Sequence, residues 1–287
     1  MLGENFQQLR QDRGISLKDV AHGVASVATV SKFENGVTDL SASKVEALLK
    51  NMGVSFREFA SLSDTSTGHA GSFLFKAVGA YRNNDNAGLR KIVADQIDCY
   101  RHSNSEIDFN NMMSAAGLYC DMTGEVLVNS TDLKTLTDKL RAIPEWNENE
   151  VILFGNSMAL LPDNRIYMLA RELLDSLDGI RQWNMSLYQD AWVALLNAVD
   201  ALMLHDSSYV PVLLRLYNAE DVPLTVSIVV FRRRFLNLCY QQRSEPSAAN
   251  AQRIMDLMNM LQFNGSSKLY GRYKRSATNL VGDIFKD

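Results

Sequence analysis

Hydrophobic residues recur every three or four positions along most of the chain, which is the spacing of one face of an α-helix. Near the N-terminus this pattern predicts three short helices, at residues 2–10, 17–21 and about 27–35. Glycines interrupt the pattern at Gly14, Gly23, Gly36 and Gly53, and each suits the turn that ends a helix. Short helices with frequent stops indicate a compact bundle, which we expect to contain five helices.

From residue 73 onward the amphipathic segments become longer. Their breaks come roughly every 15 to 20 residues, so antiparallel pairs would have the length of tetratricopeptide-like repeats, although no repeat consensus matches. The pattern predicts an all-α chain whose second part is a tetratricopeptide-like, right-handed helical solenoid. The expected helices lie at residues 89–100, 109–122, 151–161, 166–177, 187–204, 226–240, 251–261 and 269–285.

The two patterns are separated by a stretch that is poor in large apolar side chains. Small and polar residues dominate positions 61–72, a composition typical of linkers. We therefore expect an N-terminal domain at residues 1–62, a linker at 63–72 and a helical repeat domain at 73–287.

Composition and charge narrow the class of protein. The hydrophobic fraction of 46% and the charged fraction of 22% are ordinary for a helix-rich globular protein. The net charge is −4, so any nucleic-acid binding must be local to one surface. Three scattered cysteines suit neither a disulfide framework nor a metal site, and they favour a reducing compartment. With no signal peptide and no apolar run long enough to cross a membrane, we expect a cytoplasmic protein without cofactor or metal.

The third predicted helix has one apolar and one polar face. Val27, Val30 and Phe33 recur at intervals of three and are expected to face the core. A helix turns about 100° per residue, which places the polar side chains on the opposite face, where hydroxyls and a lysine can reach base edges or phosphates in a major groove. The outward positions are Ala28, Ser31, Lys32 and Asn35, with Thr29 on the flank.

The neighbouring segments supply further candidate DNA contacts. Arg10 and Arg13 are expected to face outward from the first helix, and Ser16 to cap the second. Because its carboxylate repels phosphate, Glu34 is instead expected to form a helix cap or an internal ion pair with Arg10. The full set of candidate DNA contacts is Arg10, Arg13, Ser16, Lys18, Ser26, Ala28, Thr29, Ser31, Lys32 and Asn35.

The motif Ser31-Lys32-Phe33-Glu34-Asn35-Gly36, preceded by Ile15-Ser16-Leu17, resembles the Cro/C1-type helix-turn-helix. The resemblance covers about 60 residues and implies a DNA-binding domain. Leu17 and Ala28 stand where many such domains carry Gln, so few base contacts are expected. Acidic and basic residues nearly cancel in this region, and a single domain should therefore bind weakly. A dimer on two half-sites is the expected form.

The segment Trp146-Asn147-Glu148-Asn149-Glu150-Val151-Ile152-Leu153-Phe154-Gly155-Asn156-Ser157-Met158 is similar to the equivalent part of Rgg-type regulators (Rgg/GadR/MutR) of the peptide-responsive RRNPP group. This resemblance spans nearly the whole chain. It implies a helix-turn-helix joined to a tetratricopeptide-like domain that dimerises and binds a short secreted signalling peptide in a concave groove.

Several polar residues are candidates for contact with such a peptide. Asn156 lies in an apolar helix, so its amide needs a partner, which could be neighbouring backbone or the main chain of an extended peptide. The basic run at 232–234 could bind a carboxylate or form a solvated face. The candidate peptide contacts are Arg82, Asn111, Asn156, Tyr188, Asn197, Arg233 and Asn237.

Catalysis is not predicted, because the four histidines are scattered and no nucleophile motif or Gly-rich phosphate loop occurs. The prediction is a sequence-specific transcriptional regulator that binds promoter DNA as a homodimer and is controlled by a short signalling peptide, as in quorum sensing. RNA polymerase is a further candidate partner, and no membrane is involved. The alternative is a helix-turn-helix regulator or scaffold that a protein partner controls, with no peptide ligand.

Overall fold

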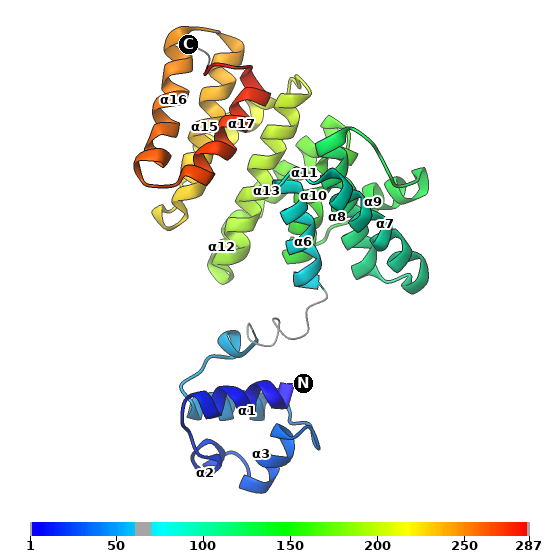
Figure 1. Cartoon of the computed structure of the whole chain (residues 1–287), viewed down its shortest axis with the longest axis vertical. Coiled ribbons are helices and arrows are strands. Elements are labelled where there is room, and N and C mark those ends of the chain that lie inside the picture. Colours follow the sequence, from blue (N-terminus) through cyan, green and yellow to red (C-terminus); the bar gives the residue numbers. More distant parts are fainter. Residues whose placement is uncertain (1, 61–69, 286–287) are drawn as a thin grey trace. The chain divides into compact units, whose positions relative to one another are not determined.

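The computed structural model describes residues 2–60 and 70–285, and every regular element among them is a helix (Figure 1). Contacts divide the chain into two compact units, Met1–Lys76 and Ala77–Asp287. No helix in the described ranges has both the length and the apolar character needed to cross a membrane. Of the predicted linker, residues 63–69 lie outside the described residues. Residues 70–72 form the first turn of a helix.

Between residues 2 and 60, the structure describes four helices of the N-terminal unit and a helical segment at residues 56–60. Its core is aromatic: the Phe6 ring meets Phe33 and Phe59 edge to face, with centroids 5.5 and 6.1 Å apart, and all three side chains are buried. These contacts tie the first, third and last helical segments together and confirm the predicted five-helix bundle. The helices are α1 (Leu2–Asp12), α2 (Leu17–Ala21), α3 (Val27–Glu34) and α4 (Ala42–Asn51).

The C-terminal unit is a stack of helix pairs, entered through α6 (Ala70–Arg82). The predicted tetratricopeptide-like helical domain is confirmed. Four of its helices, α6, α9, α12 and α14, were not among the predicted ones. The pairs are built from α7 (Asn86–Ser103), α8 (Glu106–Thr123), α9 (Ser130–Arg141), α10 (Glu148–Ser157), α11 (Asp163–Asp175), α12 (Leu177–Trp183), α13 (Met185–Leu204), α14 (Val210–Ala219), α15 (Ser227–Ser244), α16 (Ala248–Phe263) and α17 (Ser267–Val281). Two 3-10 turns, η1 (Met158–Leu160) and η2 (Leu224–Val226), follow α10 and precede α15.

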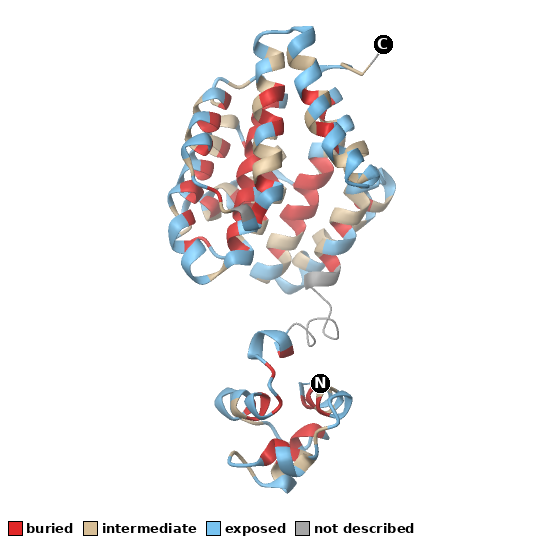
Figure 2. Ribbon diagram, turned by 90° about the vertical axis from the view of Figure 1, so that its left-hand side faces the viewer, coloured by how far each residue is buried: buried red, intermediate tan, exposed pale blue. Residues whose placement is uncertain are grey.

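Helices α8, α10, α13 and α15 pack side by side and form one layer of this unit. Helices α7, α11 and α14 pack on that layer, and α16 and α17 close its C-terminal end. Buried residues, red in Figure 2, line the facing sides of the helices, while exposed residues follow their outer sides.

Small residues allow the layer to pack closely. A Cβ added at Gly117 of α8 would lie 2.1 Å from the backbone oxygen of Asn156 in α10, far inside van der Waals contact. On the other side of α10, Gly155 faces Ala194 of α13, and a Cβ there would lie 3.3 Å from the Ala194 Cβ. The segment around Asn156 is therefore held between two neighbouring helices.

Candidate functional site

Helix α3 presents the polar face that its sequence predicts. Its N-cap is Ser26, whose hydroxyl accepts a hydrogen bond from the Thr29 N–H at 3.1 Å. Val30 and Phe33 are buried in the core, as expected, but Val27 is 44% exposed, so its predicted core position was wrong. Val27 is the first residue of the helix and precedes the turn that packs against the bundle. Of the predicted outward residues, Ala28, Lys32 and Asn35 are exposed, and Thr29 and Ser31 are partly buried.

Several candidate DNA contacts already take part in local hydrogen bonds. The Ser16 hydroxyl caps α2, accepting from the Asp19 N–H at 3.1 Å and donating to its carboxylate at 2.6 Å. The Asn35 side-chain amide donates to the Ser31 carbonyl at 2.8 Å. These bonds fix the side chains at the ends of α2 and α3, which limits their freedom to adapt to a ligand.

The prediction that Arg10 faces outward was wrong. Arg10 is 8% exposed, and its guanidinium donates to both carboxylate oxygens of Glu34, at 2.6 and 2.8 Å. Its third bond goes to the Ile15 carbonyl at 2.8 Å. The hydrogen bond to Glu34 raises the pKa of Arg10. The internal ion pair expected for Glu34 is confirmed, and it engages the guanidinium group of Arg10.

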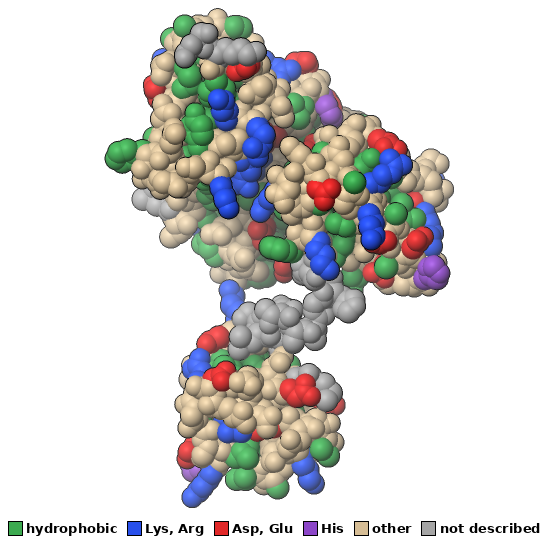
Figure 3. Space-filling view, in the orientation of Figure 1, with side chains coloured by type: hydrophobic (Ala, Val, Ile, Leu, Met, Phe, Trp, Pro, Cys, Tyr) green, Lys and Arg blue, Asp and Glu red, His purple; other side chains and the backbone are tan. Residues whose placement is uncertain are grey.

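The remaining cations of this unit differ in their availability. Arg13 donates to the Glu58 carboxylate at 2.7 Å and to the Met52 carbonyl at 3.3 Å, which holds it against the C-terminal part of the unit. Lys18 and Lys32 are exposed and form no ion pair with any residue that the structure describes. On the visible face of this unit, basic side chains are scattered between acidic ones (Figure 3). Of Arg10, Arg13, Lys18 and Lys32, the two lysines are thus the ones without a carboxylate partner among the described residues.

The C-terminal unit contains a cluster of charged and phenolic side chains. The Tyr81 hydroxyl donates to the Asp121 carboxylate, and Arg232 pairs with Asp200. Burial raises the pKa of Tyr81, with further raising by Asp121 and Asp200 and an opposing effect of Arg232. These groups come from α6, α8, α13 and α15, so four helices separated in sequence meet at this point.

Positive charge exceeds negative charge in this cluster. The pKa of Arg272 on α17 is lowered, first by burial and then by repulsion from Arg82, Arg232 and Arg275. We call these four residues the arginine cluster. Arg82, Arg272 and Arg275 form no ion pair within the described part of the chain, whereas Arg232 has Asp200. Figure 3 shows basic side chains gathered on one face of this unit, where the C-terminal helices meet the middle ones.

Three of the predicted peptide contacts lie on the neighbouring helices α8, α10 and α13. The Asn156 amide donates to the Ile152 carbonyl of its own helix at 3.0 Å, and the Asn197 amide donates to the Gly155 carbonyl at 3.3 Å. Both amide oxygens accept no hydrogen bond from a described residue, and Asn111 is partly buried on α8. The structure thus places spare acceptors on adjacent helices of one layer.

Three other predicted contacts are structural. The Arg233 guanidinium donates to the carbonyls of Tyr217 and Glu220, at 2.6 and 2.9 Å, and so closes the end of α14. Asn237 exchanges two hydrogen bonds with Asn218, at 2.8 and 3.0 Å. Tyr188 is buried, and its ring packs edge to face on Trp192. Arg233 and Asn237 thus bind α15 to α14, and Tyr188 packs within α13; contact of these three side chains with a peptide stays a prediction.

The residues that sequence reasoning missed are the partners in the cluster: Tyr81, Asp121, Asp200, Arg272 and Arg275. Of the other members of the cluster, Arg82 was among the predicted peptide contacts, and Arg232 belongs to the basic run at 232–234. Adjacent positions on a helix point about 100° apart. The run therefore sends Arg232 toward the arginine cluster and Arg233 toward α14.

Comparison with known proteins agrees with this architecture. The family model "HTH-type transcriptional regulator Rgg, C-terminal domain" matches residues 93–275, and a helix-turn-helix model matches residues 6–59. The chain belongs to the Rgg family. The prediction of a transcriptional regulator, and not an enzyme, is confirmed by this membership.

Solved structures with the same fold cover almost the whole chain. The SHP pheromone receptor Rgg2 of Streptococcus dysgalactiae is 19% identical, with a TM-score of 0.68, and the match covers 96% of this chain and 98% of that one. A protein of Listeria monocytogenes EGD-e, described as a candidate transcriptional regulator, is 18% identical with a TM-score of 0.71 over 96% and 97% of the chains. The PrgX/cCF10 complex gives 14% identity and a TM-score of 0.65 over 98% and 92%.

Proposed function

We propose that this Rgg-family chain is a peptide-responsive regulator that binds promoter DNA as a homodimer. The observation that carries the proposal is the arginine cluster, in which Arg232 pairs with Asp200 while the other three arginines have no ion-pair partner among the described residues. Asn156 and Asn197, with unused amide oxygens, lie on α10 and α13 of the same unit. Two proteins of the same fold are described as a pheromone receptor and as a complex with cCF10, which supports a peptide ligand here.

The chemistry of the site suggests which peptide it would hold. Guanidinium groups form strong, often two-pronged hydrogen bonds with carboxylates, so an acidic side chain or the C-terminal carboxylate of the peptide would lie at the arginine cluster. The amide oxygens of Asn156 and Asn197 would accept hydrogen bonds from the N–H groups of an extended main chain. Exposed apolar side chains, Val193 at 43% and Ile228 at 49%, are available on α13 and α15. The proposed ligand is a short apolar peptide with one acidic group.

DNA would be bound by the exposed side of α3. Lys32 and Lys18 would contact phosphates, and the partly exposed hydroxyls of Thr29 and Ser31 would reach base edges. Val27, exposed at the start of α3, offers an apolar contact to a thymine methyl group. With so few free cations, one unit would bind weakly, and two units on two half-sites would supply the affinity.

Dimerisation is supported by unpartnered apolar side chains on α16. Phe263 is 93% exposed and Met260 is 57% exposed, one turn apart on the same helix. Exposed large apolar side chains that lie together mark interaction surfaces. In the proposed sequence of events, the peptide shifts the dimer between states that differ in DNA affinity or in contact with RNA polymerase, in the cytoplasm.

The proposal is tested by fluorescence anisotropy of a labelled DNA fragment from upstream of the gene for this chain. Synthetic peptides encoded by short reading frames beside the gene are added to the purified full chain. A peptide-dependent change in DNA affinity or in transcription with added RNA polymerase supports the proposal. Identical results with and without every peptide, together with control by a co-purified protein, would favour the protein-partner alternative.

A further inference from the structure

A separate pocket of about 340 Å³ opens between α9 and α11. Its walls come from the last turns of α9, the first turns of α11 and Leu161, which follows η1. It shares no residue with the arginine cluster, and Asn111, Asn156 and Asn197 do not line it. Ligand pockets in proteins measure about 300–1,000 Å³, so this one has room for a small molecule.

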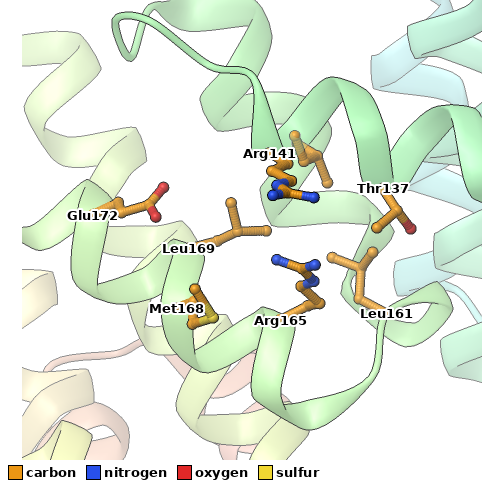
Figure 4. A pocket seen from close by; sticks show the side chains of 8 residues that line it. Thr137, Arg141, Leu161, Arg165, Met168, Leu169 and Glu172 are labelled. Carbon is orange, nitrogen blue, oxygen red and sulfur yellow. The ribbon is translucent and has the colours of Figure 1, made fainter.

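Two cations line this pocket, the exposed Arg141 and the half-buried Arg165. Figure 4 shows the guanidinium groups of Arg141 and Arg165 pointing toward one another, from α9 and α11 respectively. Neither forms an ion pair with any carboxylate of the described residues, and the Glu172 carboxylate at the side of the pocket pairs with neither. Like charges that approach each other repel, and an anion between them would remove that repulsion. Two guanidinium groups against one carboxylate leave an excess of positive charge here.

The rest of the lining is apolar. Leu140, Leu161 and Leu169 are each no more than 5% exposed and form the inner wall. Met168 is 46% exposed at the side of the pocket, and its flexible thioether can adapt to the shape of an apolar group. A ligand that satisfied the whole pocket would therefore carry a charged end and an apolar body.

We propose that this pocket binds a small amphipathic anion, in which one carboxylate or phosphate group is joined to a short apolar chain. The anionic group lies between Arg141 and Arg165, where each guanidinium can donate two hydrogen bonds to it. The apolar chain lies on Leu161 and Leu169. Because α11 packs against α13, which carries Asn197, the occupied pocket adjoins the layer that bears the proposed peptide contacts.

The test is isothermal titration calorimetry on the full chain. Octanoate and octyl phosphate are the probes, because they share the apolar chain and differ in the anionic group. Octanol and inorganic phosphate are the controls, since each lacks one half of the proposed ligand. We expect at least one of the two probes to bind saturably, with one molecule per chain. The probe with the higher affinity identifies the anionic group that the pocket takes. Neither control should bind at the same concentrations.

Two variants locate the binding. Arg141→Gln combined with Arg165→Gln removes both charges and should weaken probe binding about tenfold or more, the effect expected from losing a charged hydrogen bond. Arg181→Gln removes the same kind of charge from an exposed position on α12 outside the pocket and should leave probe binding unchanged. Far-ultraviolet circular dichroism checks that both variants are folded.

Three results would overturn the proposal. The first is the absence of saturable probe binding to the natural chain. The second is unchanged probe affinity in a folded variant that lacks both Arg141 and Arg165. The third is a natural chain that binds no probe, together with a changed sedimentation coefficient in the variant that lacks both arginines. That result would make the pocket a subunit contact.

Discussion

Arg10 and Glu34 form a two-pronged ion pair that joins α1 to the last turn of α3, with heavy-atom distances of 2.6 and 2.8 Å. Glu34 is 1% exposed, so its carboxylate depends on this partner for compensation. The pair sets the position of the proposed recognition helix without touching DNA itself.

Replacing Arg10 by Met should therefore destabilise the N-terminal unit by about 3–5 kcal/mol, because an unpaired buried charge remains. The measurement is amide hydrogen exchange of α1 and α3, followed by mass spectrometry. Lys50→Met breaks the exposed pair with Glu46 and is the control, with an expected effect below about 1 kcal/mol. Equal amide protection of α1 and α3 in both variants would show that the buried pair contributes nothing to the stability of this unit.

Gly117→Ala should strongly destabilise the C-terminal unit. A Cβ at this position meets the backbone oxygen of Asn156 at 2.1 Å, so α8 and α10 would have to separate. Gly179→Ala is the matched control, because a Cβ at this helical position has no atom within 4 Å. It should stabilise the chain by about 0.5–1 kcal/mol, the helix propensity difference between Ala and Gly. Urea unfolding followed by tryptophan fluorescence measures the free energy of unfolding of both variants. An unchanged free energy of unfolding in Gly117→Ala would contradict the close packing of α8 and α10.

Lys32→Ala should weaken binding to promoter DNA, most strongly at low salt. If Lys32 contacts one phosphate, the slope of log affinity against log salt concentration should fall by about 0.9 per half-site. Lys50→Ala removes a lysine from the end of α4 and should leave the slope unchanged. Fluorescence anisotropy at several salt concentrations gives both slopes. Equal slopes for Lys32→Ala and the natural chain would contradict the proposal that α3 lies in the DNA interface.

Phe263→Ser should lower the proportion of dimer, because it removes an apolar side chain that is 93% exposed on α16. An exposed side chain contributes little to folding, so the variant should remain folded. Phe75→Ser changes an equally apolar, 83% exposed residue outside α16 and is the control. Sedimentation velocity at several concentrations measures the dimer. A dimer that survives Phe263→Ser unchanged would place the subunit contact elsewhere.

The sequence predicted helix positions better than side-chain partners. The three-residue spacing of Val30 and Phe33 correctly indicated the buried side of α3, because helix periodicity is a local property. Arg10 was misplaced because its partner, Glu34, lies 24 residues away and orientation depends on packing. Likewise, no local pattern distinguishes Arg232 from Arg233; the directions differ only once α14 is in place.

Two of the helices that escaped prediction, α9 and α14, did so for local reasons. In α9 three leucines recur at helical spacing, but they stand among so many polar side chains that the segment as a whole is hydrophilic and was passed over. In α14 a proline follows the first residue, where it suits a helix start but also resembles a break. The close approach at Gly117 is invisible without knowledge of which helices are neighbours.

The most direct test of the account is peptide-dependent DNA binding by Arg272→Gln and Arg215→Gln. Arg272 belongs to the arginine cluster and has no ion-pair partner among the described residues, so Gln removes charge without leaving a carboxylate alone. Arg215 is an exposed residue of α14 and serves as the control. With an active peptide, the account predicts that Arg215→Gln responds like the natural chain, while Arg272→Gln needs about tenfold more peptide for the same change in DNA affinity. An unaltered peptide response in Arg272→Gln would contradict the account.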